Sequence, residues 1–248
     1  MTYRYSDVFK YKDLRPAVEQ ILKEQADIKT GWKYVKSRRA FVYKVSKNMT
    51  VEISTGFSPK GTFIGFDFKI TIQHKFIKEI SEKLGHRKPF SEMMLVRNNI
   101  RYMPKEYYYG SCTVFLPNTA DLFGEQHRKG NKSYVYLAEF PDRLSTLFDL
   151  SENEIKCLFD LSSEEKLVES IIDHPIGKFS GEHVLMIHLM LGQDEYYDKL
   201  IEYYNQPSEV IWPQNIDRFN SNEGFNQPVA KQLMAIYKQG DFPKFDFL

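Results

Sequence analysis

The chain has 248 residues, of which 42% are hydrophobic and 27% are charged, a composition typical of a globular protein of one or two domains. No apolar run reaches the roughly 18 residues that cross a bilayer, and the N-terminus lacks an apolar signal segment, so we expect a cytoplasmic protein without a membrane segment. The two cysteines, Cys112 and Cys157, lie far apart and outside any CxxC motif, which favours free thiols over a disulfide scaffold.

The net charge of +1 hides an asymmetry between the two parts of the chain. Residues 1–150 carry 26 lysines and arginines against 16 acidic residues, a net charge of +10. Residues 151–248 carry 8 against 17, a net charge of −9, so the two parts together return +1. Such a split indicates either charged partners or neutralisation of one part by the other.

The first part is organised around a run of four predicted strands. A helix over residues 13–28, which Asp13 could cap, precedes it, and Gly31 is placed to follow the helix. Apolar and polar residues then alternate with the period of two that indicates strands, over residues 32–36, 40–45, 49–54 and 62–73. The short connections favour an antiparallel meander, and a helix over residues 75–84 follows.

The next segments are less regular until helical patterns take over. Residues 93–103 fit either a helix or a strand, residues 107–116 predict a strand, and residues 117–131 predict a loop. From residue 134 we expect helices, one starting at Pro141 and two introduced by capping patterns at Ser151 and at Ser162-Ser163. A helical hairpin around Gly192 and a last helix over residues 223–238 complete the pattern.

These elements predict an α+β protein with an N-terminal antiparallel sheet flanked by helices and an all-α C-terminal part. We place the sheet domain at residues 1–135 and an acidic helical region at residues 136–248. The connection between them lacks a Pro/Gly/Ser-rich linker, so the two parts can share one core.

The sequence contains no recognisable catalytic or metal-binding motif. His183 and His188 are five residues apart, which is not the i, i+4 spacing of HExxH, and we expect neither a metal nor a cofactor. No GxSxG or phosphate-binding loop occurs. An enzyme remains an alternative only if a site assembles from scattered residues, such as Cys112 or His127 with Arg128.

The predicted sheet carries a basic, aromatic-rich segment. Aromatic residues that could stack on bases interleave there with cations that could neutralise phosphates. The cations are Lys33, Lys36, Arg38, Arg39, Lys44 and Lys47. The same alternation is typical of the solvated face of an ordinary sheet, so nucleic-acid binding stands as the alternative function.

The helical part carries acidic residues mixed with tyrosines, a combination that suits a protein surface aimed at a basic partner. The residues we select for this role are Glu164, Glu165, Glu169, Asp194, Glu195, Tyr196, Tyr197, Asp198 and Glu202. Solvated helix faces would also account for them.

Two stretches resemble known families. The first helix, Gly31-Trp32 and the strands through Phe66-Asp67-Phe68 are similar to uncharacterised families of small bacterial cytoplasmic proteins, some of which accompany toxins as immunity proteins. That resemblance implies a non-catalytic binder of a toxin domain. The segment Leu189 to Gly192 followed by Tyr196-Tyr197 is similar to a tetratricopeptide half-repeat, although no second copy follows at 34 residues.

The function predicted by these features is non-catalytic protein binding, of the immunity or antitoxin type. The acidic residues and tyrosines would mask a basic partner by steric and electrostatic contact.

Overall fold

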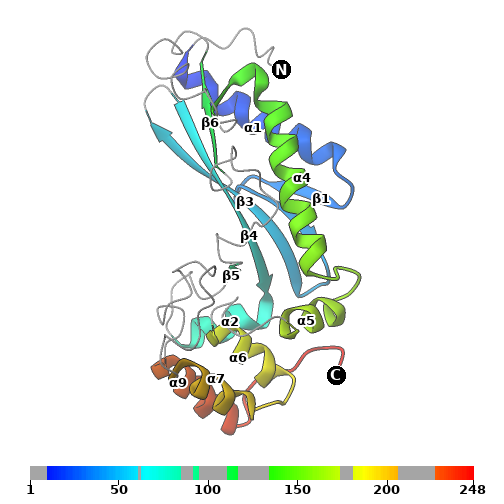
Figure 1. Cartoon of the computed structure of the whole chain (residues 1–248), viewed down its shortest axis with the longest axis vertical. Coiled ribbons are helices and arrows are strands. Elements are labelled where there is room, and N and C mark those ends of the chain that lie inside the picture. The colour runs from blue at the N-terminus through cyan, green and yellow to red at the C-terminus, as the bar shows by residue number, and fades with distance from the viewer. Residues whose placement is uncertain are drawn as a thin grey trace. The chain divides into compact units, whose positions relative to one another are not determined.

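A computed structural model of the chain describes residues 10–60, 63–84, 92–94, 111–116, 134–173, 181–205 and 227–248. Its strands are β1 (Trp32–Val35), β2 (Ala40–Lys44), β3 (Met49–Lys60), β4 (Phe63–His74), β5 (Glu92–Met94), β6 (Ser111–Phe115) and β7 (Tyr134–Tyr136). Its helices are α1 (Tyr11–Ile28), α2 (Lys75–Lys83), η6 (Leu137–Glu139, a 3-10 turn), α4 (Phe140–Leu158), α5 (Glu164–Ile172), α6 (Gly181–Met190), α7 (Tyr196–Asn205) and α9 (Gln227–Lys238) (Figure 1).

The protein has the α+β class that the sequence predicts. Within the described residues, seven strands form one sheet in the order β1-β2-β3-β4-β6-β7, with β5 also paired to β4. The first four strands are neighbours in chain order, as a meander requires. The β1–β2, β4–β5 and β4–β6 pairs are antiparallel, whereas β6 and β7 are parallel, so the sheet as a whole is mixed.

The chain divides into two compact units that alternate along the sequence. Unit 1 comprises residues 1–44, 51–70 and 100–157, and unit 2 comprises residues 45–50, 71–99 and 158–248. The helix α4 therefore belongs with the sheet residues of unit 1, in keeping with a core shared across the expected boundary at residues 135 and 136. That boundary itself stays a prediction. No helix in the described parts is long and apolar enough to cross a membrane.

The core of unit 1 is aromatic. The ring of Phe148 on α4 packs edge-on against Trp32 of β1 at 5.3 Å and against Phe41 of β2 at 5.0 Å. Farther along the sheet, Phe140 at the start of α4 stacks on Phe66 of β4 at 5.1 Å. The apolar stripe of α4 thus covers aromatic side chains contributed by three strands (Figure 1).

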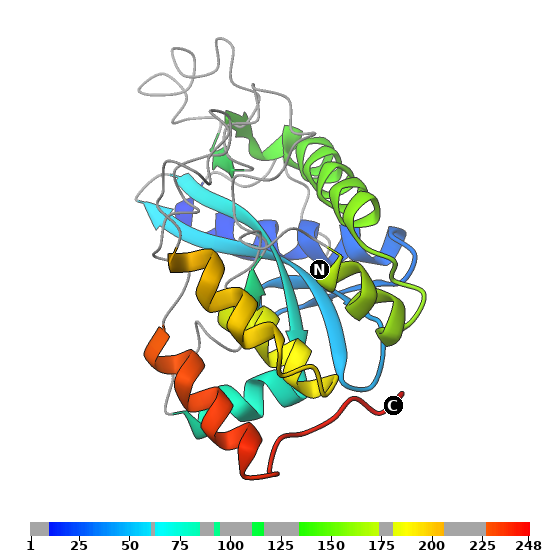
Figure 2. The same cartoon turned by 60° about the horizontal axis from the view of Figure 1, so that its bottom comes forward.

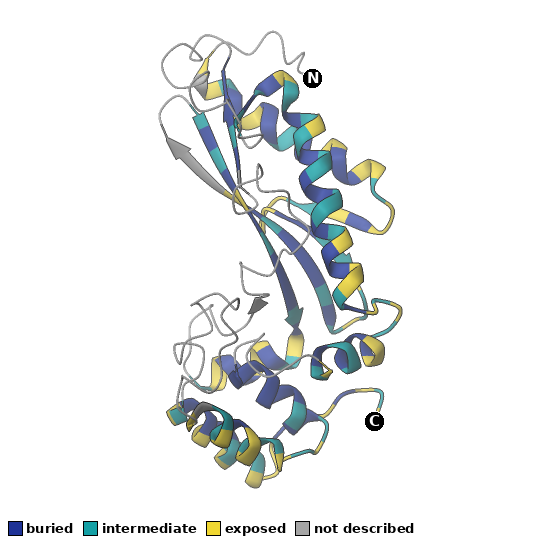
Figure 3. Cartoon of the chain, viewed as in Figure 1, coloured by how far each residue is buried: buried dark blue, intermediate teal, exposed yellow. Residues whose placement is uncertain are grey.

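Unit 2 is built around α6. All but one of the ten residues of this helix are buried, the exception being His188, which is half-buried (Figure 3). The helix contacts α2, α5, α7 and α9. The helix has no polar face, since its apolar residues point in all directions, and such a helix needs this coverage because any exposed side would leave apolar surface in water.

Three details of the sequence prediction are corrected. Ser151 does not start a helix, because α4 continues through it and the buried Ser151 hydroxyl donates to the Leu147 carbonyl at 2.8 Å. The helix α1 begins at Tyr11, so Asp13 lies in its first turn and forms no cap. The strand β7 was not expected, because three residues are too few to show a periodic pattern.

Most other elements fall where the sequence predicts them. Ser163 caps α5 by accepting a hydrogen bond from the Lys166 amide at 3.1 Å. Gly192, with φ of +78°, joins α6 and α7 into the expected hairpin. The residues 93 and 94, which fit two structures in the sequence, belong to β5, whereas residues 95–103 and the predicted loop at 117–131 lie outside the described residues.

Truncation of Phe148 should destabilise unit 1 strongly. We expect Phe148→Ala to lower the free energy of unfolding by about 3–5 kcal/mol, because it removes a fully buried ring from contact with two others. Urea denaturation followed by circular dichroism measures this change. The control is Ile28→Ala on α1, where the side chain is 71% exposed and the expected change is within about 0.5 kcal/mol. Equal effects of the two substitutions would contradict the assigned core.

Candidate functional site

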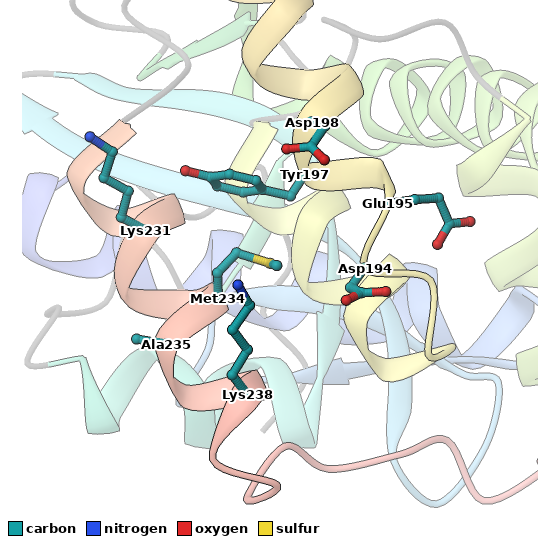
Figure 4. A pocket seen from close by; sticks show the side chains of 8 residues that line it. All are labelled: Asp194, Glu195, Tyr197, Asp198, Lys231, Met234, Ala235 and Lys238. Carbon is teal, nitrogen blue, oxygen red and sulfur yellow. The ribbon is translucent and has the colours of Figure 1, made fainter.

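A groove of about 570 Å³ lies between α7 and α9 in unit 2 (Figure 4). Its wall from α7 and the turn before it carries carboxylates and a tyrosine, and its wall from α9 carries two lysines with apolar side chains between them (Figure 4). The lining residues are Asp194, Glu195, Tyr197, Asp198, Lys231, Met234, Ala235 and Lys238. The groove therefore includes four of the nine residues that the sequence selected for partner binding.

Helical spacing explains why these side chains share one groove. Lys231, Met234, Ala235 and Lys238 stand at positions i, i+3, i+4 and i+7, which lie on one face of a helix. On the facing wall, the Tyr197 amide donates to the Asp194 carbonyl at 3.1 Å, so the turn that follows Gly192 winds directly into α7.

The charges in the groove are separated by sign. Asp194 and Asp198 stand on one wall, and Lys231 and Lys238 stand on the other. Within the described part of the chain, none of these four groups forms an ion pair within 4 Å. All four residues are exposed, and their charges can pair with those of a ligand without first breaking an internal bond.

The groove offers both charged and apolar contacts to a ligand. Among the described residues that line it there is no serine, cysteine or histidine. Tyr197 and Met234 offer apolar contact between the charged rows, and both are half-buried. Aromatic and methionine side chains framed by charges are typical of protein-binding surfaces.

The sequence did not single out the α9 wall. The sequence predicts only a last helix over residues 223–238 there, although the spacing of seven residues between Lys231 and Lys238, with Met234 between them, places the two lysines in one row. Only the packing of α9 beside α7 sets this row opposite the carboxylates.

The other predicted acidic residues are in different environments. Glu202, one turn after Asp198 on α7, and Glu165 on α5 are exposed. Glu169 forms an ion pair with Lys166 at 2.7 Å. Glu164 is buried and accepts hydrogen bonds inside unit 2, from His74 at 3.0 Å and from a serine hydroxyl, so it is not available to a partner.

Tyr196 supports the hairpin and does not line the groove. Its ring stacks on that of His188 at 3.6 Å, and His188 Nδ1 lies 2.8 Å from Gln193 Oε1. Burial raises the pKa of Tyr196 to about 12. Burial also lowers the pKa of His188, although its hydrogen bond with Gln193 opposes this effect.

The basic residues of the nucleic-acid alternative do not form one free surface. Five belong to unit 1, and Lys47 belongs to unit 2. Lys36 pairs with Glu19 at 2.7 Å, and Lys47 pairs with Asp246 at 2.9 Å. Arg38 pairs with the buried carboxylate of Glu52.

The three remaining cations are all exposed, but they are not equivalent. Lys33 and Lys44 lie on strands β1 and β2. Arg39 has a φ of +51°, and its carbonyl accepts bonds from the amide and hydroxyl of Thr55 at 2.7 and 2.9 Å.

Strand alternation separates the aromatic rings from these lysines. Trp32 pairs with Tyr43 across the ladder and Tyr34 pairs with Phe41, so the four rings share one face of the sheet. Trp32 and Phe41 are buried there against α4, and burial, followed by the charge of Glu19 on α1, raises the pKa of Tyr34 to about 12. Lys33 and Lys44 alternate to the opposite face. The rings and the lysines therefore do not form one base-stacking platform.

Of the residues named for an enzymatic site, the structure describes only Cys112. Cys112 is fully buried, and burial raises the pKa of its thiol well above the usual range, which keeps it from forming a thiolate. His127 and Arg128 lie outside the described residues. Among the residues that are described, no three histidine, cysteine or acidic side chains are grouped to hold a metal ion.

Comparison of the chain with protein-family models, with characterised proteins and with solved structures found no match.

The two cysteines should differ sharply in reactivity. Cys157 is exposed on α4, whereas Cys112 is buried in β6, so we expect a disulfide reagent such as DTNB to modify one thiol per folded chain and two in denaturant. In the Cys157→Ser variant the folded protein should release no thionitrobenzoate within the time that the parent needs for one equivalent. Rapid modification of both thiols in the folded parent would contradict the burial of β6.

Proposed function

We propose that this chain is a non-catalytic protein-binding module, of the immunity or antitoxin type, that holds a segment of its partner in the groove between α7 and α9. The observation that carries the proposal is the groove itself, in which two rows of opposite charge flank Tyr197 and Met234. The acidic balance of residues 151–248 supports a partner with a basic surface.

The charges that line the groove indicate which side chains the bound segment of the partner presents. A purely basic segment would meet Lys231 and Lys238 as well as Asp194 and Asp198, and the like charges would repel. The best complement is a polypeptide segment that presents basic side chains along α7, acidic side chains along α9, and an apolar side chain to Met234. Charge complementarity of this kind raises the association rate and fixes the register of the partner.

Exchange of the charges between the two walls tests the groove. The variant D194K/D198K/K231E/K238E keeps the net charge of the chain but inverts the pattern that the partner meets. We expect its affinity for the captured partner to fall at least about tenfold, or ~1.4 kcal/mol, because the charged contacts of the four exchanged residues become repulsive. The partner is first recovered with the tagged parent after nuclease treatment, and its affinity is then measured by calorimetry.

A matched control tests whether the position of the reversed charges matters, or only the change in the net charge of the chain. The triple variant D194K/E195K/D198K should also weaken binding, whereas E82K/D173K/D241K makes the same change in charge at exposed positions of unit 2 outside the groove and should bind as the parent does. Equal affinities of all these variants would exclude the groove as the binding surface.

Nucleic-acid binding by the basic strands remains the alternative, and the same recovery experiment distinguishes it. In that case nuclease treatment would remove the bound material. The affinity for an oligonucleotide would then fall steeply with salt concentration, because neutralised phosphates release counterions. Lys33→Glu with Lys44→Glu would reduce the slope, and the groove variants would leave it unchanged.

A further inference from the structure

A buried histidine joins three segments of unit 2. His74 ends β4 and immediately precedes α2, and its side chain is fully buried. Its Nε2 atom lies 3.0 Å from Glu164 Oε1 of α5. Its Nδ1 atom accepts a hydrogen bond from the Phe76 amide at 3.3 Å, which makes His74 the N-cap of α2.

These two contacts fix the protonation state of the ring. An atom that accepts from an amide carries no proton, so Nδ1 is the bare nitrogen and Nε2 donates its proton to Glu164. The other oxygen of Glu164 accepts from the Ser46 hydroxyl, whose oxygen in turn accepts from the amides of Asn48 and Met49 at 3.0 Å each. The network is complete when His74 is neutral.

The C-terminal tail, residues 241–248, lies against this histidine. Phe245 is buried, and its ring meets that of His74 edge-to-face with centroids 5.2 Å apart. Asp246 pairs with Lys47 at 2.9 Å and accepts from Asn48 Nδ2 at 2.8 Å. The tail contains neither helix nor strand, so side-chain contacts hold it in place (Figure 2).

We propose that His74 is a pH-dependent latch: the neutral ring caps α2 and supports the C-terminal tail, and protonation of the ring releases the tail. A protonated imidazole carries a hydrogen on both nitrogens. Its Nδ1 hydrogen would face the Phe76 amide hydrogen and the positive end of the α2 dipole, so the cap would be lost and the ring would have to move.

Displacement of the ring removes the packing surface of Phe245. The remaining anchors of the tail include Phe242, which packs on Tyr237 with centroids 5.8 Å apart, and Asp246, which forms an exposed pair with Lys47 and accepts from Asn48 Nδ2. Exposed pairs contribute little to stability. The tail is therefore the segment that detaches first, while α5 and α6 stay packed.

Burial and the neighbouring charges shift the pKa of His74 in opposite directions. Burial lowers the pKa of His74, whereas the hydrogen bond and charge of Glu164, and the charges of Asp246 on the tail and Glu79 on α2, raise it; the net result is a lowered pKa. Because the folded state then binds the proton less readily than the unfolded state, the contribution of the latch is complete above about pH 6.5 and is lost as the pH falls below that value.

A dye on the last residue reports release of the tail. Leu248 is 69% exposed and Cys112 is buried, so Leu248→Cys in a Cys157→Ser background offers a single accessible thiol for a maleimide dye. We expect its fluorescence anisotropy to fall as the pH drops below about 6.5, the ordinary histidine pKa, before circular dichroism shows loss of helix. An anisotropy that stays flat until global unfolding would overturn the latch.

Two histidine variants of this labelled protein identify the group that titrates. In His74→Asn the amide oxygen can still cap α2 but does not titrate, so the anisotropy should remain high over the same range. His188→Asn is the matched control, because burial also lowers the pKa of His188 in the same unit, and it should lose anisotropy as the parent does. A fall that persists in His74→Asn, or disappears in His188→Asn, would overturn the assignment.

The tautomer provides a test without substitution at the site. Long-range ¹H–¹⁵N correlation spectra of the unmodified protein at about pH 8, above the ordinary histidine pKa, should show a neutral His74 ring protonated at Nε2. A ring protonated at Nδ1 could not cap α2 and would overturn the proposal even if the Asn variant failed to fold.

Discussion

The complete burial of α6 is the constraint on which the arrangement of unit 2 depends. A ten-residue helix whose apolar residues point in all directions needs cover from several sides, and α2, α5, α7 and α9 provide it. Because α7 and α9 pack on the same helix, their outer faces are brought beside each other, and the charged groove forms between them. The candidate function is thus a consequence of how one buried helix is covered.

Polar groups in this protein divide into those that complete the fold and those that remain free for a ligand. Glu164 illustrates the first kind, since its two oxygens bind His74 and Ser46 inside unit 2. Asp194 and Asp198 illustrate the second, since they are exposed at the groove without an ion-pair partner in the described part of the chain. Buried polar groups are costly unless they are paired, so the internal network specifies one arrangement of its segments, whereas the groove charges cost little in water.

The strand alternation in unit 1 limits what the basic segment can do. The same period of two that attracts attention in the sequence places the aromatic rings on the face covered by helices and the lysines on the other. Three of the six cations are also engaged by carboxylates. In the basic segment, the aromatic rings therefore contribute to the core beneath the helices, and the lysines contribute to the solvated face of the sheet.

The sequence by itself determined the α+β class, the four-strand run, the caps at Ser163 and Gly192 and the presence of acidic residues with tyrosines on α7. These features depend on local periodicity and turn chemistry, which act over a few residues. Only the tertiary structure decided that α4 runs through Ser151, that Lys231 and Lys238 face the α7 carboxylates, and that Glu164 is withdrawn into a network with His74. These outcomes are set by contacts between residues up to 118 positions apart, and no local pattern in the sequence contains the energies of such contacts.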